Sequence, residues 1–159
     1  MFLEHKWIYR RIKEQVPEDP DFLVPLGKAD IKRAGRDVTI VASGMMVHLA
    51  LEAAEALAQE GIEVEVVDLR SIVPLDTETI VSSVAKTSRA IVLFESHRFL
   101  GIGAEVASVI AEEAFGSLDA PVVRLSPPNV PVPFSPALED AYLPQVADIE
   151  DAVRKLSAW

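Results

Sequence analysis

The stretch Glu63-Val64-Glu65-Val66-Val67-Asp68-Leu69-Arg70-Ser71-Ile72-Val73-Pro74-Leu75-Asp76 decides the fold. Apolar and acidic residues alternate in its first half and then give way to a continuous apolar run, which is typical of a strand entering a sheet covered on both faces. Asp68 and Arg70 follow at the carboxyl end of this strand. Pro74 excludes further ladder pairing, and Asp76 is a good N-cap for a helix. The stretch therefore predicts a strand, a charged turn and the start of a helix.

The same alternation of strand and helix patterns extends on both sides of this stretch. Strands are predicted at 29–32, 37–43, 62–68, 90–94 and 121–125, the first of them a short charged edge strand. Helices are predicted at 45–59, 76–86, 104–115 and 146–156, and the five prolines between 127 and 136 predict a loop. This order predicts a three-layer α/β/α domain with a mainly parallel sheet.

The first 16 residues form an unusual start. Residues 7–12 are predicted to form a short helix, and Trp7, Ile8 and Tyr9 are large apolar groups with little local core to cover them. They either fold back on the domain or belong to a preceding domain. Residues 17–36 combine a linker rich in proline and acid with the edge strand, and 37–159 form the domain itself.

Composition excludes several classes of function. The chain has 159 residues, half of them apolar, which is enough for one domain with a core. The net charge of −10 argues against nucleic acid and anionic membranes, and favours a basic protein partner or simple solubility. Without cysteine there is no disulfide, thiolate catalysis or cysteine metal site. The absence of a membrane-length apolar run and of a signal-peptide pattern predicts a cytoplasmic location.

The sequence lacks the common catalytic and ligand-binding motifs. The sequence has no P-loop and no G-x-S-x-G elbow, and Gly101 and Gly103 are followed by Val106 where a dinucleotide motif needs a third glycine. The three histidines lie far apart, so no two-ligand metal motif exists. The Gly-Asp-Gly and later Asn that mark thiamine-diphosphate binders are also absent. We therefore expect no catalytic, cofactor-binding or metal-binding residue in this chain.

Polar residues at two strand ends leave one alternative open. Glu95 and His97 follow the strand at 90–94 and could act as a general acid–base pair, or His97 could simply bond within its loop. Asp68 and Arg70 could bind an anion, or they could hold the turn that contains Pro74, which we favour. Together the four polar residues would form a crevice for a small molecule.

A series of strings spaced along the chain carries a resemblance to a known family. They are F-L-E-H-K-W-I-Y-R at 2–10, V-P at 16–17, P-L-G-K-A at 25–29, D-V-T-I-V at 37–41, M-V-H-L-A-L-E-A-A-E at 46–55, D-L-R-S-I-V-P-L-D at 68–76, K-T-S-R at 86–89, G-A-E-V-A at 103–107, F-G-S-L-D-A-P-V-V-R at 115–124, P-V-P-F-S at 131–135 and L-P at 143–144. In this order they resemble the carboxyl-terminal domain of transketolase-like enzymes. The match is closest to the β-subunit of thiamine-diphosphate-dependent 2-oxo acid dehydrogenases.

The resemblance implies a fold and a parent enzyme. The family sheet has five strands, and the first is an antiparallel edge strand that pairs away from its sequence neighbour. The parent enzyme would decarboxylate pyruvate, a branched-chain 2-oxo acid or a similar substrate with thiamine diphosphate and Mg²⁺. Residues 1–16 would be the remnant of a pyrimidine-binding domain that is otherwise missing. Leu100 stands where the family often has glycine, and the position of His97 varies in the family.

The resemblance also implies partners. The α-subunit and a second β-subunit would assemble with this domain, which would form a homodimer in isolation. The basic subunit-binding domain of a dihydrolipoyl acyltransferase would dock near Asp119 and the terminal Trp159. The predicted function is therefore non-catalytic assembly and partner docking. A free-standing small-molecule binder that uses Asp68, Arg70, Glu95 and His97 is the alternative, whereas an independent hydrolase or transferase lacks a nucleophile.

Overall fold

The computed structural model describes residues 1–159 and contains one five-stranded sheet in the order β1-β3-β2-β4-β5. The strands are β1 (Asp30–Arg33), β2 (Val38–Ala42), β3 (Val64–Asp68), β4 (Ala90–Leu93) and β5 (Val123–Leu125). β1 pairs with β3 in antiparallel orientation, while all other pairs are parallel. The structure thus confirms the α/β class, the mainly parallel sheet and the antiparallel edge strand.

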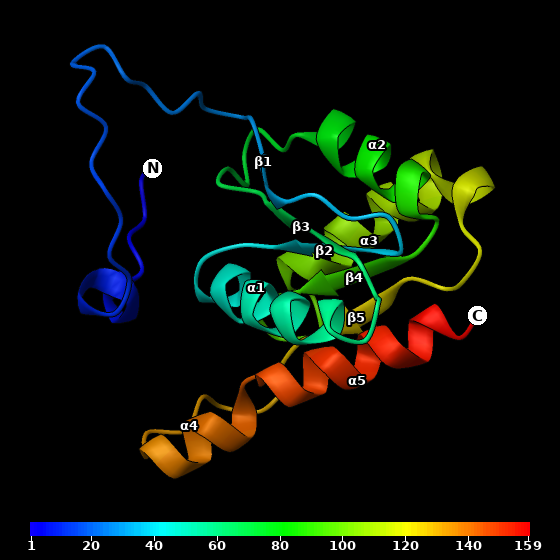
Figure 1. The fold of residues 1–159 in the computed structure, drawn as a ribbon. Helices are drawn as coiled ribbons and strands as arrows, with labels where there is room; N and C mark the ends of the chain where they lie inside the picture. Colours follow the sequence, from blue (N-terminus) through cyan, green and yellow to red (C-terminus); the bar gives the residue numbers. More distant parts are fainter.

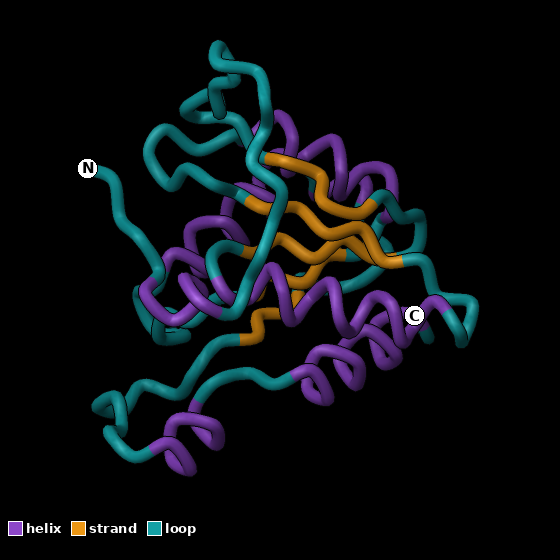
Figure 2. Tube along the Cα trace, turned by 60° about the vertical axis from the view of Figure 1, so that its left-hand side comes forward, coloured by secondary structure: helices purple, strands orange, loops and turns teal.

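Helices cover both faces of this sheet, as Figures 1 and 2 show. They are α1 (Met45–Ala58), α2 (Thr77–Thr87), α3 (Ile102–Glu113), α4 (Pro136–Tyr142) and α5 (Val146–Ser157), with short 3₁₀ helices η1 (Lys6–Arg10) and η2 (Phe115–Ser117). One apolar cluster joins the sheet to α1 and α5, and a second joins it to α2 and α3. The predicted three-layer arrangement is therefore confirmed. None of these helices is both long enough and apolar enough to span a membrane.

The central strand β2 shows how the sequence divides the core into two clusters. Val38 and Ile40 point into the cluster beneath α1 and α5, whereas Val41 points into the cluster beneath α2 and α3. Successive side chains alternate between the faces of a strand, so every residue of β2 is buried when both faces are covered. This explains the continuous apolar runs in the sequence.

Two polar side chains are buried beneath α2. Thr39 of β2 lies opposite Glu65 of β3, and neither side chain is exposed. The Thr39 hydroxyl donates a hydrogen bond to the Ser83 carbonyl oxygen at 3.0 Å, and its oxygen lies 2.7 Å from that of Thr87. Oε2 of Glu65 accepts a hydrogen bond from Lys86, whereas its Oε1 has no hydrogen-bond partner. The layer between sheet and α2 is therefore fixed partly by polar contacts.

Two elements differ from the sequence predictions. The leader forms a 3₁₀ helix at Lys6–Arg10 where a helix over 7–12 was predicted. The prolines predicted a loop up to residue 136, but α4 begins there because Pro136 occupies its first turn, where the missing amide hydrogen costs nothing. Leu100 has a φ of 56°, in the left-handed region, which explains why glycine suits that position.

Asp76 caps α2 as predicted and also ties the helix to the chain before β1. Its carboxylate accepts hydrogen bonds from the amides of Thr79 at 3.3 Å and Ala29 at 2.9 Å. Burial acts to raise the pKa of Asp76, but these hydrogen bonds and the nearby Lys28 ammonium outweigh it and hold the pKa below its usual value. The carboxylate form is therefore the one that the fold stabilises.

We expect Asp76→Ala to lower the free energy of unfolding by about 1–2 kcal/mol at neutral pH, because it removes an N-cap and a second amide bond. The native carboxyl has the lowered pKa, so its contribution is present above the unfolded pKa and is lost as the pH falls through the native one. Urea unfolding at several pH values checks this. The gap between wild type and variant should close in acid; a gap that is independent of pH would contradict the assignment.

Candidate functional site

The carboxyl ends of the parallel strands gather several polar residues on one edge of the sheet. The connection after β2 leads to α1 on one face, while the connection after β4 leads to α3 on the other. Such a switch point between neighbouring strands is where open α/β sheets form a ligand crevice. Gly44 follows β2 and Glu95 follows β4, so both residues lie at this switch point. The edge therefore holds the position at which a site is expected.

The segment before the linker reaches this switch point through His5. His5 Nε2 lies 2.9 Å from Oε2 and 3.2 Å from Oε1 of Glu95. A Cβ atom placed on Gly44 would lie 3.4 Å from Cδ2 of His5 and 3.6 Å from Oε2 of Glu95, so all three residues are close neighbours. The leader thus crosses the carboxyl ends of β2 and β4. Figure 1 shows it beside the sheet, on the side where the loop after β3 and helix α4 also lie.

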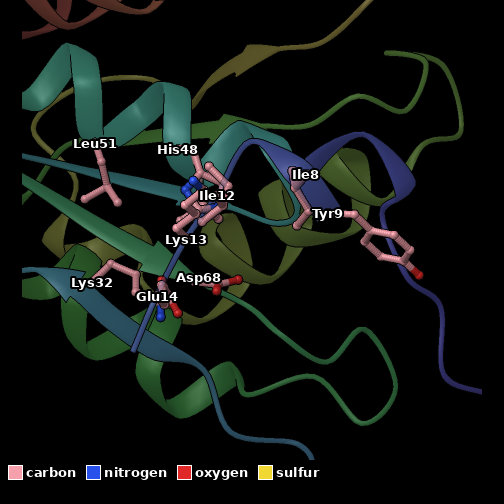
Figure 3. A pocket seen from close by; sticks show the side chains of 10 residues that line it. Ile8, Tyr9, Ile12, Lys13, Glu14, Lys32, His48, Leu51 and Asp68 are labelled. Carbon is pink, nitrogen blue, oxygen red and sulfur yellow. The ribbon is translucent and has the colours of Figure 1, made fainter. Parts of the chain in front are cut away.

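A cleft of about 460 Å³ lies between the leader and the body of the domain. Figure 3 shows Ile8 and Ile12 of the leader facing α1, while Tyr9 is turned away. The lining residues are Ile8, Tyr9, Ile12, Lys13, Glu14, Lys32, Val47, His48, Leu51 and Asp68. Burial raises the pKa of Asp68 against the opposing effects of the Arg70 amide and the nearby cations. The cleft therefore has an apolar wall on α1 and a charged end at β3.

Asp68, Arg70 and Pro74 lie together in the turn after β3. The Arg70 amide donates to Oδ1 of Asp68 at 3.1 Å, and Nη2 of Arg70 lies 2.5 Å from Oδ2 of Asp30 on β1. Arg70 has a φ of 53°, and the Val73–Pro74 peptide bond is cis. These contacts connect the turn to the edge strand, and a structural role for all three residues stays our prediction.

The four residues of the predicted crevice do not share one set of contacts. Glu95 bonds His5, whereas Nε2 of His97 lies 3.0 Å from the carbonyl oxygen of Val130. The ring of His97 also meets the edge of Tyr142 at a centroid distance of 6.3 Å. Asp68 lines the leader cleft, while Glu95 and His97 are absent from its lining. The structure therefore gives no hydrogen bond between Glu95 and His97.

The predicted partner-binding residues lie away from this edge. Asp119 precedes β5; its amide donates to the Ser88 carbonyl oxygen, and its Oδ2 lies 3.8 Å from Nη1 of Arg89. The carboxylate of Asp119 is 61% exposed and Trp159 is 72% exposed. Figure 1 shows the C-terminus on the side of the sheet opposite the leader. No hydrogen bond or ion pair joins Asp119 to Trp159, so they form two points on a broad surface.

Trp159 lines a shallow groove of about 380 Å³ between β5 and α5. The other lining residues are Val123, Leu125, Asp148, Asp151, Ala152, Lys155 and Leu156. Apolar side chains therefore form its floor, and two carboxylates and one ammonium group surround it. The sequence pattern singled out Trp159 but missed this groove, because β5 and α5 are brought together only by the fold.

His5 is a contact residue that the sequence analysis did not single out. It lies 90 positions before Glu95, in a leader that mixes apolar, aromatic and charged residues without a clear pattern. No periodicity connects the two, so no signal within the chain could have paired them. Nor do three or more His, Asp or Glu side chains come together in a group that could hold a metal ion.

Comparison with known proteins places this fold in a family. The family model "Transketolase, C-terminal domain" matches residues 27–149, which is well over half of the chain. The chain belongs to the transketolase C-terminal domain family. A solved structure described as "Split gene transketolase, inactive beta4 tetramer" is similar over 90% of this chain and 46% of its own, with a TM-score of 0.74 and 37% identity.

Curated members of this family confirm the resemblance to β-subunits. The chain is 47% identical to the β-subunit of acetoin:2,6-dichlorophenolindophenol oxidoreductase from Cupriavidus necator, over 98% of the chain and 45% of that protein. It is 46% identical to the β-subunit of the pyruvate dehydrogenase E1 component from Bacillus subtilis, over 98% and 47%. It is 42% identical to the 2-oxoisovalerate dehydrogenase β-subunit of the same organism, over 100% and 49%. The chain spans about half the length of these relatives.

Proposed function

We propose that this domain serves in the β-subunit of a thiamine-diphosphate-dependent dehydrogenase, where it supports assembly and partner docking and carries out no catalysis. The observation that carries the proposal is identity of 42–47% to three such β-subunits over nearly the whole chain. The parent enzyme would act on pyruvate, a branched-chain 2-oxo acid or acetoin in the cytoplasm. Residues 1–16 would belong to a preceding pyrimidine-binding domain, 17–36 would form the linker and edge strand, and 37–159 the docking domain.

The contacts of the polar side chains support a non-catalytic role. Glu95 is engaged by His5, and His97 is engaged by the carbonyl oxygen of Val130. A general acid–base pair needs the two groups free to reach a substrate proton. Both are instead used to fix parts of the chain against each other.

The donor groups of this chain do not fit the metal that accompanies thiamine diphosphate. The sequence lacks the Gly-Asp-Gly and later Asn that mark thiamine-diphosphate binders, and no three His, Asp or Glu side chains gather in a group that could hold a metal ion. Cofactor and metal would therefore be held by other parts of the parent enzyme. The α-subunit and a second β-subunit are the partners that the proposal implies, with a homodimer of this chain in isolation.

The docking surface for an acyltransferase would include the exposed Asp119 and the groove beside Trp159. A basic subunit-binding domain would find carboxylates at Asp148 and Asp151 and an aromatic side chain in the same groove. Complementary charge accelerates association and makes it salt-sensitive, and a partly desolvated aromatic group often contributes most to affinity.

We expect Asp119→Lys and removal of Trp159 each to weaken binding of the subunit-binding domain of a dihydrolipoyl acyltransferase from the same source. Calorimetry at low and high salt should show a loss of roughly tenfold for the Trp159 deletion at both salt concentrations. The loss for Asp119→Lys should be larger at low salt, because added ions screen exposed charges.

Glu18→Lys and Phe134→Ala provide matched controls. Glu18 undergoes the same change of charge in the exposed linker, and Phe134 is a fully exposed aromatic residue elsewhere on the surface. Both should bind like the wild type. Wild-type affinity in both test variants would show that the docking face lies elsewhere.

A small-molecule binder remains the second candidate, and the leader cleft is the observation that favours it. Its volume of about 460 Å³ falls within the range of ligand pockets, and it combines an apolar wall with charged groups. The cleft includes Asp68 but neither Glu95 nor His97, so the site would differ from the crevice predicted from sequence.

A further inference from the structure

We propose that the leader cleft binds a small aliphatic amino acid. Lys13 would pair with the carboxylate of this ligand, Glu14 with its ammonium group, and the apolar walls with its side chain. The inference rests on the second candidate of the proposed function, the small-molecule binder, and adds the chemical class of the ligand. It requires residues 8–14 to lie against the body of the domain, whichever domain of the parent enzyme they belong to.

The cleft has the size and the position of a ligand site. Its volume of about 460 Å³ equals that of about 15 water molecules at about 30 Å³ each, which is ample for one amino acid. In the proposed parent enzyme residues 8–14 would end the preceding domain, so the cleft would lie between two domains. Ligand pockets occur preferentially at such domain interfaces.

Aliphatic side chains form two facing walls of the cleft. Val47 and Leu51 lie four residues apart on one face of α1. Ile8 and Ile12 lie on the leader side, where the Ile12 amide donates to the Ile8 carbonyl oxygen at 3.1 Å. Figure 3 shows both isoleucines facing α1 and the ring of Tyr9 turned away. The walls therefore suit an aliphatic side chain.

Two charged groups of the lining are already engaged within the domain. Nζ of Lys32 lies 3.0 Å from Oδ2 of Asp30, so this ammonium group has its own counterion. Oδ1 of Asp68 accepts the Arg70 amide at 3.1 Å, and burial raises the pKa of this carboxyl towards its neutral form. Neither group therefore offers an unopposed charge to a ligand.

The remaining charged groups are one ammonium and one carboxylate. Lys13 and Glu14 both line the cleft, and neither forms an ion pair within the chain. Their Cα atoms are about 3.8 Å apart, so the two flexible side chains can reach both charged groups of one amino acid. The ring of His48 makes no hydrogen bond within the chain and offers a further nitrogen to the carboxylate. Figure 3 shows Lys13 and His48 nearer α1, and Glu14 nearer Asp68.

This balance of charge disfavours other classes of ligand. A phosphate or a dicarboxylate would bring two negative charges beside Glu14, in a chain whose net charge is −10. A diamine would bring two positive charges beside Lys13 and Lys32. A ligand with one charge of each sign and an apolar side chain matches all of the groups that are left unpaired.

The test titrates the full chain with L-leucine and follows the backbone amides of Val47 and Leu51 by nuclear magnetic resonance. Isocaproate, which lacks the ammonium group of leucine, and isoamylamine, which lacks its carboxylate, are the comparison ligands. We expect leucine to shift both amides and to bind roughly fivefold more tightly than either comparison ligand. Each of these lacks one exposed ion pair, and fivefold is near the upper end of what such a pair contributes.

Two variants assign the charges to their partners. Lys13→Met should weaken leucine and isocaproate by roughly fivefold and leave isoamylamine unchanged, because the amine has no carboxylate to lose a partner. Glu14→Gln should weaken leucine and isoamylamine and leave isocaproate unchanged. Lys6→Met and Glu18→Gln are the matched controls, because both residues are exposed and lie outside the cleft lining. Both controls should bind leucine like the wild type.

Isocaproate or isoamylamine that binds as tightly as leucine would overturn the amino acid as the ligand class and leave the small-molecule candidate standing. Amides of Val47 and Leu51 that do not shift with any of the three ligands would overturn both. Equal weakening of all three ligands by Lys13→Met would also overturn the assignment of the charges. The leader cleft and the groove at Trp159 share no residue, so these outcomes leave the proposed docking function untouched.

Discussion

Replacing Lys86 with methionine is expected to lower the free energy of unfolding by about 3 kcal/mol, near the lower end of the cost of breaking a buried ion pair. Lys86 is the cation that pairs with Glu65, whose side chain is fully buried in β3. The change leaves a buried carboxylate whose Oε1 already lacks a partner, and its other oxygen keeps only the amide of Gly35 at 3.2 Å. The Lys86 side chain is itself 46% exposed, which is why we use the lower end of that range.

Urea unfolding followed by circular dichroism measures this effect. Lys13→Met is the control, because Lys13 undergoes the same substitution in an exposed segment without an ion pair. The double variant Lys86→Met/Glu65→Gln should recover part of the lost free energy of unfolding. Glutamine is neutral, so this variant has no unpaired charge buried in β3. A loss below about 0.5 kcal/mol, the size expected for surface substitutions, would mean that the pair is in effect a surface contact.

Gly35→Ala should strongly destabilise the domain, because the added methyl group meets backbone atoms. An ideal Cβ at this position would lie 2.2 Å from the backbone nitrogen of Glu65, 2.3 Å from the carbonyl carbon of Val64 and 2.6 Å from the oxygen of Glu63. All three are backbone atoms of β3 or of the residue before it, so no side chain can rotate away. The strand or the turn before β2 must shift, at a cost of roughly 3 kcal/mol.

Gly116→Ala is the control for this experiment, because nothing lies within 4 Å of its added Cβ. Thermal unfolding should show a large drop in Tm for Gly35→Ala and almost none for Gly116→Ala. Hydrogen exchange should further locate the disturbance at the start of β3. Equal melting temperatures for the two variants would rule out the close approach of the two backbones.

Local pattern was enough to predict most of the fold. The runs at 37–43 and 62–68 predicted two buried strands because the strands of a doubly covered sheet are mostly apolar, and the structure confirms both. Asp76 was predicted as an N-cap from its type and place alone, and it accepts the expected amide bond. The proline cluster misled the prediction at α4, because composition does not distinguish a proline in a loop from one in a first turn.

The site was harder to predict than the fold, because its contacts join distant segments. Asp68 and Arg70 are near neighbours, and their mutual hydrogen bond agrees with the proximity in sequence. His5 and Glu95 are 90 positions apart, and the groove at Trp159 needs β5 and α5 to be adjacent. Such contacts depend on topology, which residue types and spacing alone do not determine.

The pairing of β1 with β3 also has a consequence for synthesis of the chain. β1 ends at Arg33 and its partner begins at Val64, so the ribosome must add 30 further residues before the first strand has an edge to join. During that interval the nascent segment Asp30–Arg33 exposes backbone donors and acceptors that could recruit another chain. Three of its four residues are charged, a composition that opposes such recruitment. The charges that mark β1 as an edge strand in the folded domain therefore also oppose its pairing with other chains before β3 has been synthesised.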